Sequence, residues 1–191
     1  MYAGHIGVAL GLKRSWPLIP LWMLVIASEL PDWTDAGLCI SGVRTPVYGM
    51  LSHSLPAVAV LAILAGTVAV VIGPSKPNGE LLVALRTPAS LMALAGPVAL
   101  AVALHMVGDW FTGLKPTWPG GPMIGLQLYR MPVVDFLLEA VVVILGWLAY
   151  RATLPQNPRA ARVASLLLAS LLILQLAADV SFALVPGLKK C

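Results

Sequence analysis

The strongest constraint on the fold of this chain is the length of its uncharged stretches. Residues 54–73, 87–108 and 163–178 contain no Asp, Glu, Lys or Arg. The hydrocarbon core of a bilayer is roughly 30 Å thick, and an α-helix needs about 20 apolar residues to cross it. The first two stretches are long enough as they stand, and the third is long enough if it continues through Asp179 to Pro186. These stretches therefore predict an integral membrane protein.

Composition supports the same conclusion. Of the 191 residues, 59% are hydrophobic and 10% are charged, with a mean hydropathy of +0.91, whereas soluble domains carry about 25% charged residues. The apolar segments show no period-two alternation, and an open sheet edge would be unsatisfied in lipid. We expect an all-α fold, a polytopic membrane helix bundle forming a single domain over residues 1–191. Four transmembrane spans are predicted at about 50–73, 87–110, 132–151 and 162–186.

The amino terminus differs from the rest of the chain. Residues 2–12 and 17–30 are apolar but short for a span, and Lys13, Arg14 and Ser15 separate them. We expect a short helical hairpin over residues 1–30, with its second helix ending at Pro31.

The two cysteines, Cys39 and Cys191, fit neither a disulfide framework nor a Cys-based zinc motif, so we expect free thiols.

Charges divide unevenly between the two faces of such a bundle. Alternating helices place seven basic residues on one face and five on the other, which favours the first face as cytoplasmic. Seven of the eight acids and all three histidines fall at or near the second, non-cytoplasmic face. The net charge of +4 comes with no basic run longer than two residues, so we expect contacts with membrane lipids and none with nucleic acid.

The most informative motif is His105-Met106-Val107-Gly108-Asp109, which closes an apolar helix. Residues four apart share a helix face, so the imidazole and the carboxylate point the same way. This spacing suits two ligands of one divalent ion. A simple hydrogen-bonded His–Asp pair explains it equally well.

Two further polar elements reach the same membrane face. Asp32 and Asp35 follow an apolar helix, where they offer either metal ligands or helix caps. His53, between Ser52 and Ser54, opens a long apolar stretch, where it is either a ligand or a solvated interfacial side chain. Imidazole combined with carboxylate suits zinc, with manganese or iron as alternatives. A convergent set of ionisable residues in a membrane predicts a functional site.

Three other acids have weaker assignments. Asp135 and Glu139 share a helix face, and we expect them to orient ligating imidazoles, although acids near a helix N-terminus also stabilise the helix dipole. Asp179 is expected to be a buried hydrogen-bond partner of Gln175, one turn away.

The order of these motifs resembles that of the small prokaryotic inner-membrane proteins described as predicted membrane-bound metal-dependent hydrolases. The matching elements, covering roughly residues 1–150, are His5 with Gly7, Leu30-Pro31-Asp32, Ser52-His53-Ser54, His105 to Asp109, Trp118-Pro119, and Asp135 after Pro132. The resemblance implies a metal bound by His5, Asp32, His53, His105 and Asp109, with an unidentified hydrolysed substrate.

The chain departs from the family pattern at two places. Thr34 stands where the family has a second Asp, and Asp35 follows one residue later. Tyr48-Gly49-Met50 stands in place of a His-Arg-Gly triplet, so a ligand and an anion-holding Arg are missing. Arg44 is the candidate substitute for that Arg. These departures bear on catalysis more than on metal binding.

Two functions compete on this evidence. The first is a metal-dependent hydrolase acting on an ester or phosphoester of a lipid-like substrate at the membrane interface, with Asp32 or Asp35 as general base for the attacking water. The second is a non-catalytic accessory subunit of a larger membrane complex that keeps a structural His/Asp metal site. Haem binding is disfavoured because no additional His lies near mid-span, and a transporter because no repeat of interrupted helices is found.

Overall fold

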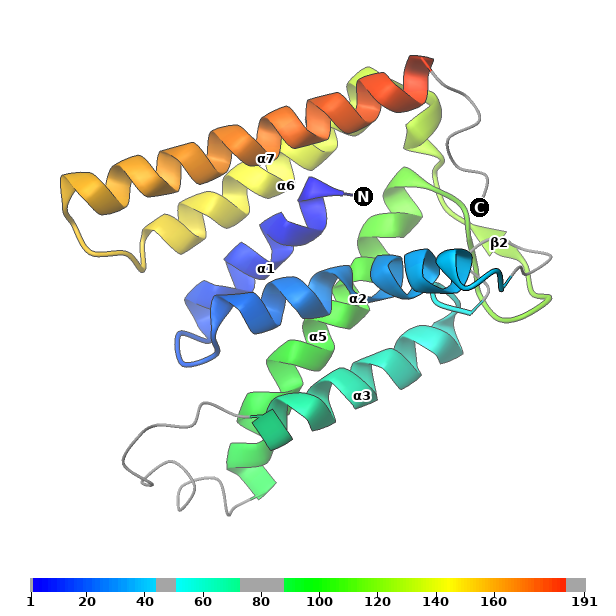
Figure 1. Ribbon diagram of the computed structural model, residues 1–191, viewed down its shortest axis with the longest axis horizontal. Helices are drawn as coiled ribbons and strands as arrows, with labels where there is room; N and C mark the ends of the chain where they lie inside the picture. The colour runs from blue at the N-terminus through cyan, green and yellow to red at the C-terminus, as the bar shows by residue number, and fades with distance from the viewer. Residues whose placement is uncertain (1, 44–50, 73–87, 185–191) are drawn as a thin grey trace.

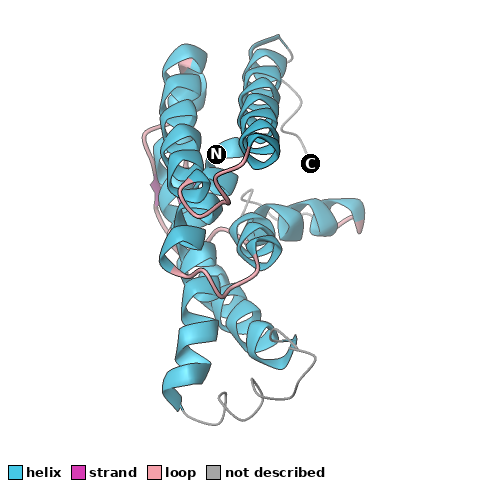
Figure 2. Ribbon diagram, turned by 90° about the vertical axis from the view of Figure 1, so that its left-hand side faces the viewer, coloured by secondary structure: helices cyan, strands magenta, loops and turns pink. Residues whose placement is uncertain are grey.

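The computed structural model describes residues 2–43, 51–72 and 88–184, and most of these residues form helices (Figure 1). A pair of two-residue antiparallel strands and one 3-10 turn complete the described part (Figure 2). The helices are α1 (Ala3–Ser15), α2 (Leu21–Ile40), α3 (Leu55–Ile72), α5 (Pro88–Thr112), α6 (Pro132–Arg151) and α7 (Pro158–Leu184). The remaining elements are β1 (Lys115–Pro116), β2 (Met123–Ile124) and η1 (Leu128–Arg130).

Four helices are long and apolar enough to cross a membrane. Their qualifying segments are Leu55–Ile72, Leu91–Thr112, Pro132–Arg151 and Pro158–Ser181. Large apolar side chains on these helices, such as Ile63 and Ile173, are about two-thirds exposed in the isolated chain, as expected for groups that face lipid. The predicted all-α bundle of four spans plus an N-terminal hairpin is confirmed.

Helix α2 is longer than the sequence predicts, because it continues through Pro31 to Ile40. The expectation that it ends at Pro31 is wrong. A proline within a helix removes one backbone hydrogen bond and crowds the carbonyl four residues earlier. Here Pro31 is buried in a helix that packs on α5 and α1, and this packing outweighs the local preference to stop. The extension carries Asp35 in the same helix as Asp32.

Cys39 therefore lies in the last turn of α2, four residues beyond Asp35. It is disulfide-bonded, so the expectation of a free thiol is wrong at this position. Cys191 lies outside the described residues.

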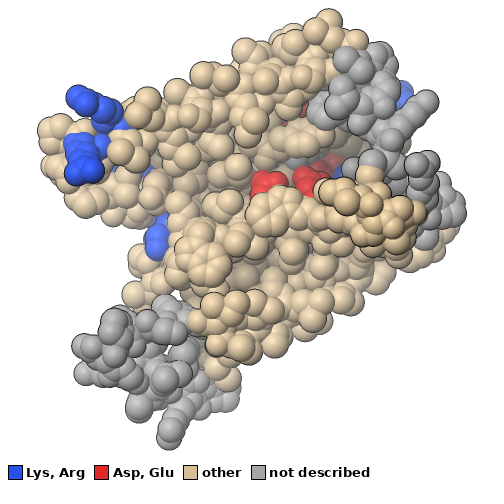
Figure 3. All heavy atoms as spheres, in the orientation of Figure 1, with Lys and Arg blue, Asp and Glu red and all other residues tan. Residues whose placement is uncertain are grey.

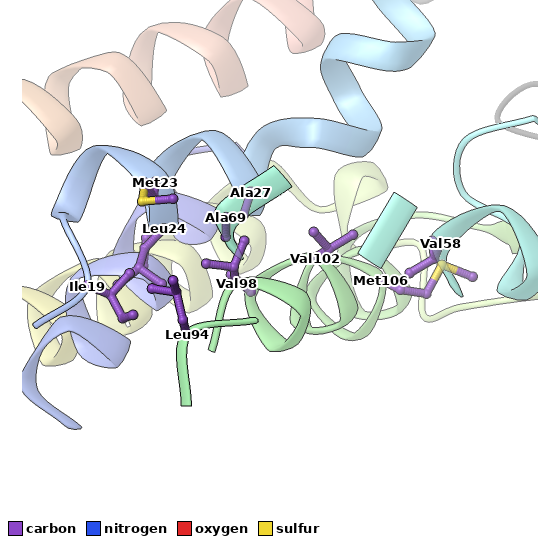
Figure 4. Close-up of a cluster of buried hydrophobic side chains, with 12 residues drawn as sticks. Ile19, Met23, Leu24, Ala27, Val58, Ala69, Leu94, Val98, Val102 and Met106 are labelled. Atoms are coloured by element: carbon purple, nitrogen blue, oxygen red, sulfur yellow. The ribbon is translucent and has the colours of Figure 1, made fainter. Parts of the chain in front are cut away.

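Two apolar clusters hold the bundle together. The first joins α2, α3 and α5 through residues such as Leu24, Ala69 and Val102 (Figure 4). The second joins α1, α6 and α7 through residues such as Leu10 and Val143. Helix α1 lies beside α6, while α2 crosses α5 (Figure 1).

The contact between α1 and α6 depends on two glycines. A Cβ atom built on Gly146 would lie 1.9 Å from the carbonyl oxygen of Gly7, and one built on Gly7 would lie 2.8 Å from the Cα atom of Val143. Any side chain at either position would push the helices apart. This close approach fixes α1, and with it His5, relative to α6.

The segment after α5 folds back over the end of the bundle. The Leu55 amide donates to the Thr117 carbonyl, and the Leu126 amide donates to the Trp110 carbonyl. These bonds tie the β1–β2 segment to the start of α3 and to the last turns of α5. Lys115, in β1, is thereby brought to the same end of the bundle as His53.

Candidate metal centre

Four of the predicted ligands converge at one end of the bundle. Asp32 comes from α2, His53 from the residues before α3, and His105 and Asp109 from the last turns of α5. One ligand atom from each lies within 4.8 Å of all the others. Both histidines and Asp109 are buried, with at most 2% of each side chain exposed, whereas Asp32 is 27% exposed. Solvent therefore reaches the cluster beside Asp32 of α2 and not beside His105 and Asp109 of α5.

The spacing of the four donor atoms matches a small divalent ion. The His53 Nε2 atom lies 3.1 Å from Asp32 Oδ1 and 3.1 Å from Asp109 Oδ2. The His105 Nε2 atom lies 3.7 Å from Asp32 Oδ1 and 3.4 Å from Asp109 Oδ2. Zinc bonds of about 2.0–2.1 Å in a tetrahedron place neighbouring ligand atoms about 3.3 Å apart. The residues present therefore fit such an ion.

The tautomer of His105 is set by α2. Its Nδ1 atom lies 2.6 Å from the carbonyl oxygen of Ser28. A carbonyl only accepts hydrogen bonds, so Nδ1 carries a proton and donates it. This leaves Nε2 as the nitrogen that faces the cluster and could bind an ion, which is the arrangement that ligating histidines use.

His53 is oriented in the same way by its own neighbours. Its Nδ1 atom lies 2.6 Å from Ser52 Oγ and 3.3 Å from Asp35 Oδ2. The Ser52 hydroxyl donates to Asp35 Oδ1, so Ser52 Oγ accepts from Nδ1. Asp35, one of the two predicted general bases, thus lies on the Nδ1 side of the His53 ring and orients it. Asp32 lies on the Nε2 side, within the cluster.

The fifth predicted ligand, His5, lies beside the four. Its ring stacks on that of His105 with centroids 3.7 Å apart, and its Nε2 atom is 3.4 Å from Asp109 Oδ1. Neither ring nitrogen has a hydrogen-bond partner among the described residues. The five residues that the sequence analysis grouped are therefore adjacent in space.

Lys115 is a charged neighbour that the motif analysis missed. Its Nζ atom lies 2.7 Å from Asp109 Oδ2, and the residue is 7% exposed. It is the one Asp, Glu, Lys or Arg between residues 110 and 129 of the sequence, and this isolation was the sequence signal that could have identified it. With three carboxylates (Asp32, Asp35 and Asp109) and one ammonium, a divalent ion would bring the formal charge of the centre to zero.

The groups outside the membrane spans show how this centre distributes charge. Burial lowers the pKa of His53, but hydrogen bonds with Asp109, Asp32 and Asp35 outweigh it and raise the pKa to about 10. Burial raises the pKa of Asp32, but the hydrogen bond with His53 outweighs it and the pKa falls to about 2. Burial and the neighbouring Asp32 raise the pKa of Glu29 to about 8. The carboxylates at the centre thus stabilise a positive charge placed between them, such as that of protonated His53.

The residues predicted to orient imidazoles take other positions. Glu139, in α6, accepts hydrogen bonds from the backbone amides of Tyr2 and Gly4 in α1. Asp135 is buried near Asp179. The predicted bond from Gln175 to Asp179 is present, with 3.0 Å between Nε2 and Oδ2. Arg44 and Tyr48-Gly49-Met50 lie outside the described residues.

Comparison with known proteins places the chain in a family. Residues 2–182 match the model of the YdjM inner membrane protein family. No curated protein and no solved structure gives a significant match. With nearly the whole length matched and four helices able to span a bilayer, the chain belongs to the YdjM inner membrane protein family and is a multi-pass protein of the inner membrane.

Proposed function

We propose that this protein is a membrane-embedded, metal-dependent hydrolase. The observation that carries the proposal is the convergence of four donor atoms, two imidazole nitrogens and two carboxylate oxygens, in which each imidazole nitrogen lies 3.1–3.7 Å from the other nitrogen and from both oxygens. Zinc fits this mixed set best, with manganese or iron as alternatives. Such an ion supplies Lewis acidity and makes water a better nucleophile near neutral pH.

The protein's own residues have distinct roles in this proposal. Ser28, Ser52 and Asp35 fix the ring tautomers of the two histidines. Asp32 is the most exposed member of the cluster, so a substrate would approach from its side. Asp32 and Asp35 remain the candidate general bases, and Asp32 has the more open position. In Figure 3, acidic atoms lie near the middle of the visible face beside α2.

The substrate class follows from position and charge. The centre lies near one end of the spans α3 and α5, where an amphiphile places its polar group while its tails stay in the bilayer. Lys115 adds a cation within 2.7 Å of a proposed ligand, Asp109. A phosphoester or carboxylic ester of a lipid-like molecule fits these features, because both develop negative charge on oxygen during hydrolysis.

A second candidate is a non-catalytic subunit of a larger membrane complex with a structural metal site. The enclosure of His53, His105 and Asp109 favours it, since structural zinc sites are closed while catalytic ones keep an open position. The departures at Thr34 and at residues 48–50 favour it too. The exposure of Asp32 favours the hydrolase.

The test uses the full-length protein purified in detergent. We expect about one zinc, manganese or iron ion per chain by elemental analysis, and metal-dependent cleavage of bis(p-nitrophenyl) phosphate or of p-nitrophenyl esters. His53→Ala and Asp109→Asn should lose both metal and activity. Thr34→Ala is the matched control, because the Thr34 hydroxyl bonds to Leu30 of its own helix. Bound metal without turnover, together with a stoichiometric membrane partner, would favour the second candidate.

We further infer that the centre faces the non-cytoplasmic side. Five described basic residues lie around the α1–α2 and α6–α7 connections, namely Lys13, Arg14, Arg151, Arg159 and Arg162. In Figure 3, most of the visible basic atoms gather at the left of the molecule, away from the acidic atoms, and basic residues favour the cytoplasm. The disulfide at Cys39 is typical of an oxidising compartment. The test introduces single cysteines into a cysteine-free variant of the protein and treats intact cells with an impermeant maleimide. The reagent should label Gln127→Cys and not Gln156→Cys; the reverse pattern contradicts this orientation.

A further inference from the structure

We propose that Glu139 and Gln175 are positioning residues, which cap helix α1 from α6 and α7 and thereby hold His5 against the metal centre. The proposal rests on the proposed function, because it concerns the placement of a residue beside the ion. It differs from the role expected for Glu139 from sequence, which was a direct bond to an imidazole.

Helix α1 begins without a cap of its own. Its N-cap residue, Tyr2, makes no side-chain capping bond. The first backbone N–H groups of a helix have no partner within the helix and must find one elsewhere. Glu139 Oε2 accepts from the amides of Tyr2 at 2.8 Å and Gly4 at 3.1 Å. Gln175 Oε1 accepts from the amide of Ala3 at 3.0 Å.

These acceptors come from far along the chain. Glu139 and Gln175 have no solvent-exposed surface, so water does not reach the amides in their place. A carboxylate at a helix N-terminus is also favoured by the helix dipole. Asp179 accepts from Gln175 Nε2 at 3.0 Å, and this bond leaves Gln175 Oε1 directed at α1. The two spans therefore define where α1 begins.

The position of His5 follows from that of the cap. His5 comes directly after Gly4, and its ring stacks on His105 and lies 3.4 Å from Asp109 Oδ1 through Nε2. A slip of α1 by one residue would turn each side chain by about 100° and move it about 1.5 Å along the axis. The cap and the Gly7–Gly146 contact together prevent that slip. Glu139 thus acts on the centre through the backbone of α1.

The experiment compares Co²⁺ binding by the full-length protein and its variants, using a competing chelator and the visible Co²⁺ spectrum. Loss of an outer partner typically costs 10–100-fold in metal affinity, so we expect Glu139→Ala and His5→Ala each to weaken binding about tenfold. The double variant should bind as His5→Ala does, since residues acting through one another are not additive. Additive losses would overturn the proposal.

Two further variants separate positioning from general stability. Glu139→Gln keeps an oxygen that accepts from Tyr2 and Gly4, so it should restore most of the affinity and the wild-type spectrum. Leu171→Ala removes a buried side chain of α7 and leaves both cap residues in the sequence, so it should lower thermal stability while leaving the affinity unchanged. A loss of affinity in Leu171→Ala equal to that in Glu139→Ala would overturn the proposal. Should Glu139→Ala not fold, Gln175→Leu removes the Ala3 acceptor and the bond to Asp179 while keeping both bonds to Glu139, and is expected to show a smaller loss of the same kind.

A metal-independent readout distinguishes this proposal from the proposed function. Hydrogen exchange of the Tyr2 and Gly4 amides, which donate to Glu139, should be faster in Glu139→Ala than in Glu139→Gln, with or without Co²⁺. If the wild-type protein binds no Co²⁺, the proposed function fails while the exchange result still decides the cap. Unchanged exchange in Glu139→Ala would overturn the cap even if Co²⁺ binds normally.

Discussion

The Nε2 atoms of His53 and His105 lie 3.1 Å apart in the interior of the bundle. The other ring nitrogen of His105 donates to the Ser28 carbonyl, and that of His53 is held by Ser52 and Asp35. Hydrogen bonds with Asp109, Asp32 and Asp35 raise the pKa of His53 to about 10, so without an ion a proton on its Nε2 atom would lie between the two rings. A bound divalent ion would take the place of that proton, with the two imidazole nitrogens and the oxygens of Asp32 and Asp109 around it.

His105 and His5 should differ in their effect on metal content. His105→Ala removes a member of the four-donor set and is expected to leave less than a tenth of the bound metal. His5→Ala removes a neighbour of that set and should retain metal with an affinity about tenfold lower. Elemental analysis after dialysis and a chelator titration measure the two effects. Equal losses in both variants would show that His5 belongs to the core set.

Asp35→Asn should weaken metal binding without removing a ligand. The amide is a poorer acceptor than the carboxylate that lies 3.3 Å from His53 Nδ1, so the ring loses its fixed orientation. A loss of about 10–100-fold in affinity is expected, as for other outer partners of ligating histidines. Chelator competition measures it, with Thr34→Ala on the same helix as the unaffected control. An unchanged affinity in Asp35→Asn would rule out this role.

Lys115→Met should destabilise the metal-free protein. Removing one partner of a buried ion pair leaves the other charge uncompensated, at a cost of about 3–5 kcal/mol. Asp109 would be that charge, since its Oδ2 atom lies 2.7 Å from Lys115 Nζ, but it keeps His53 Nε2 at 3.1 Å, so we expect a loss at or below the lower end of this range. Added zinc should recover part of the loss by neutralising Asp109. Thermal unfolding in detergent, with and without chelator, measures both effects; the exposed Arg159→Met is the control and should be neutral.

Gly146→Ala should separate α1 from α6. The new Cβ atom would lie 1.9 Å from the Gly7 carbonyl oxygen, and overpacking of this kind costs about 1–3 kcal/mol. Gly37→Ala is the matched control, because nothing lies within 4 Å of its Cβ position and alanine favours a helix by about 1 kcal/mol. Unfolding temperatures in detergent should therefore fall for the first variant and hold or rise for the second.

The sequence alone determined the membrane fold and most members of the cluster. A bilayer offers no hydrogen bonds to the backbone, so long uncharged stretches become helices of one span each. The four-residue spacing of His105 and Asp109 places both on one helix face in any α-helix. Because the helices alternate in direction, Asp32 and His53 were expected at the same end, and the structure brings them there.

Only the tertiary structure decided what surrounds these residues. Helix α2 continues through Pro31 because packing against α5 and α1 outweighs the local cost of proline, a balance that neighbouring residues do not reveal. Lys115 reaches Asp109 through the fold of a segment without helical periodicity. Glu139 bonds to the backbone of α1 across 135 residues of chain. Such contacts depend on how separate helices pack, whereas hydropathy and spacing report on one helix at a time.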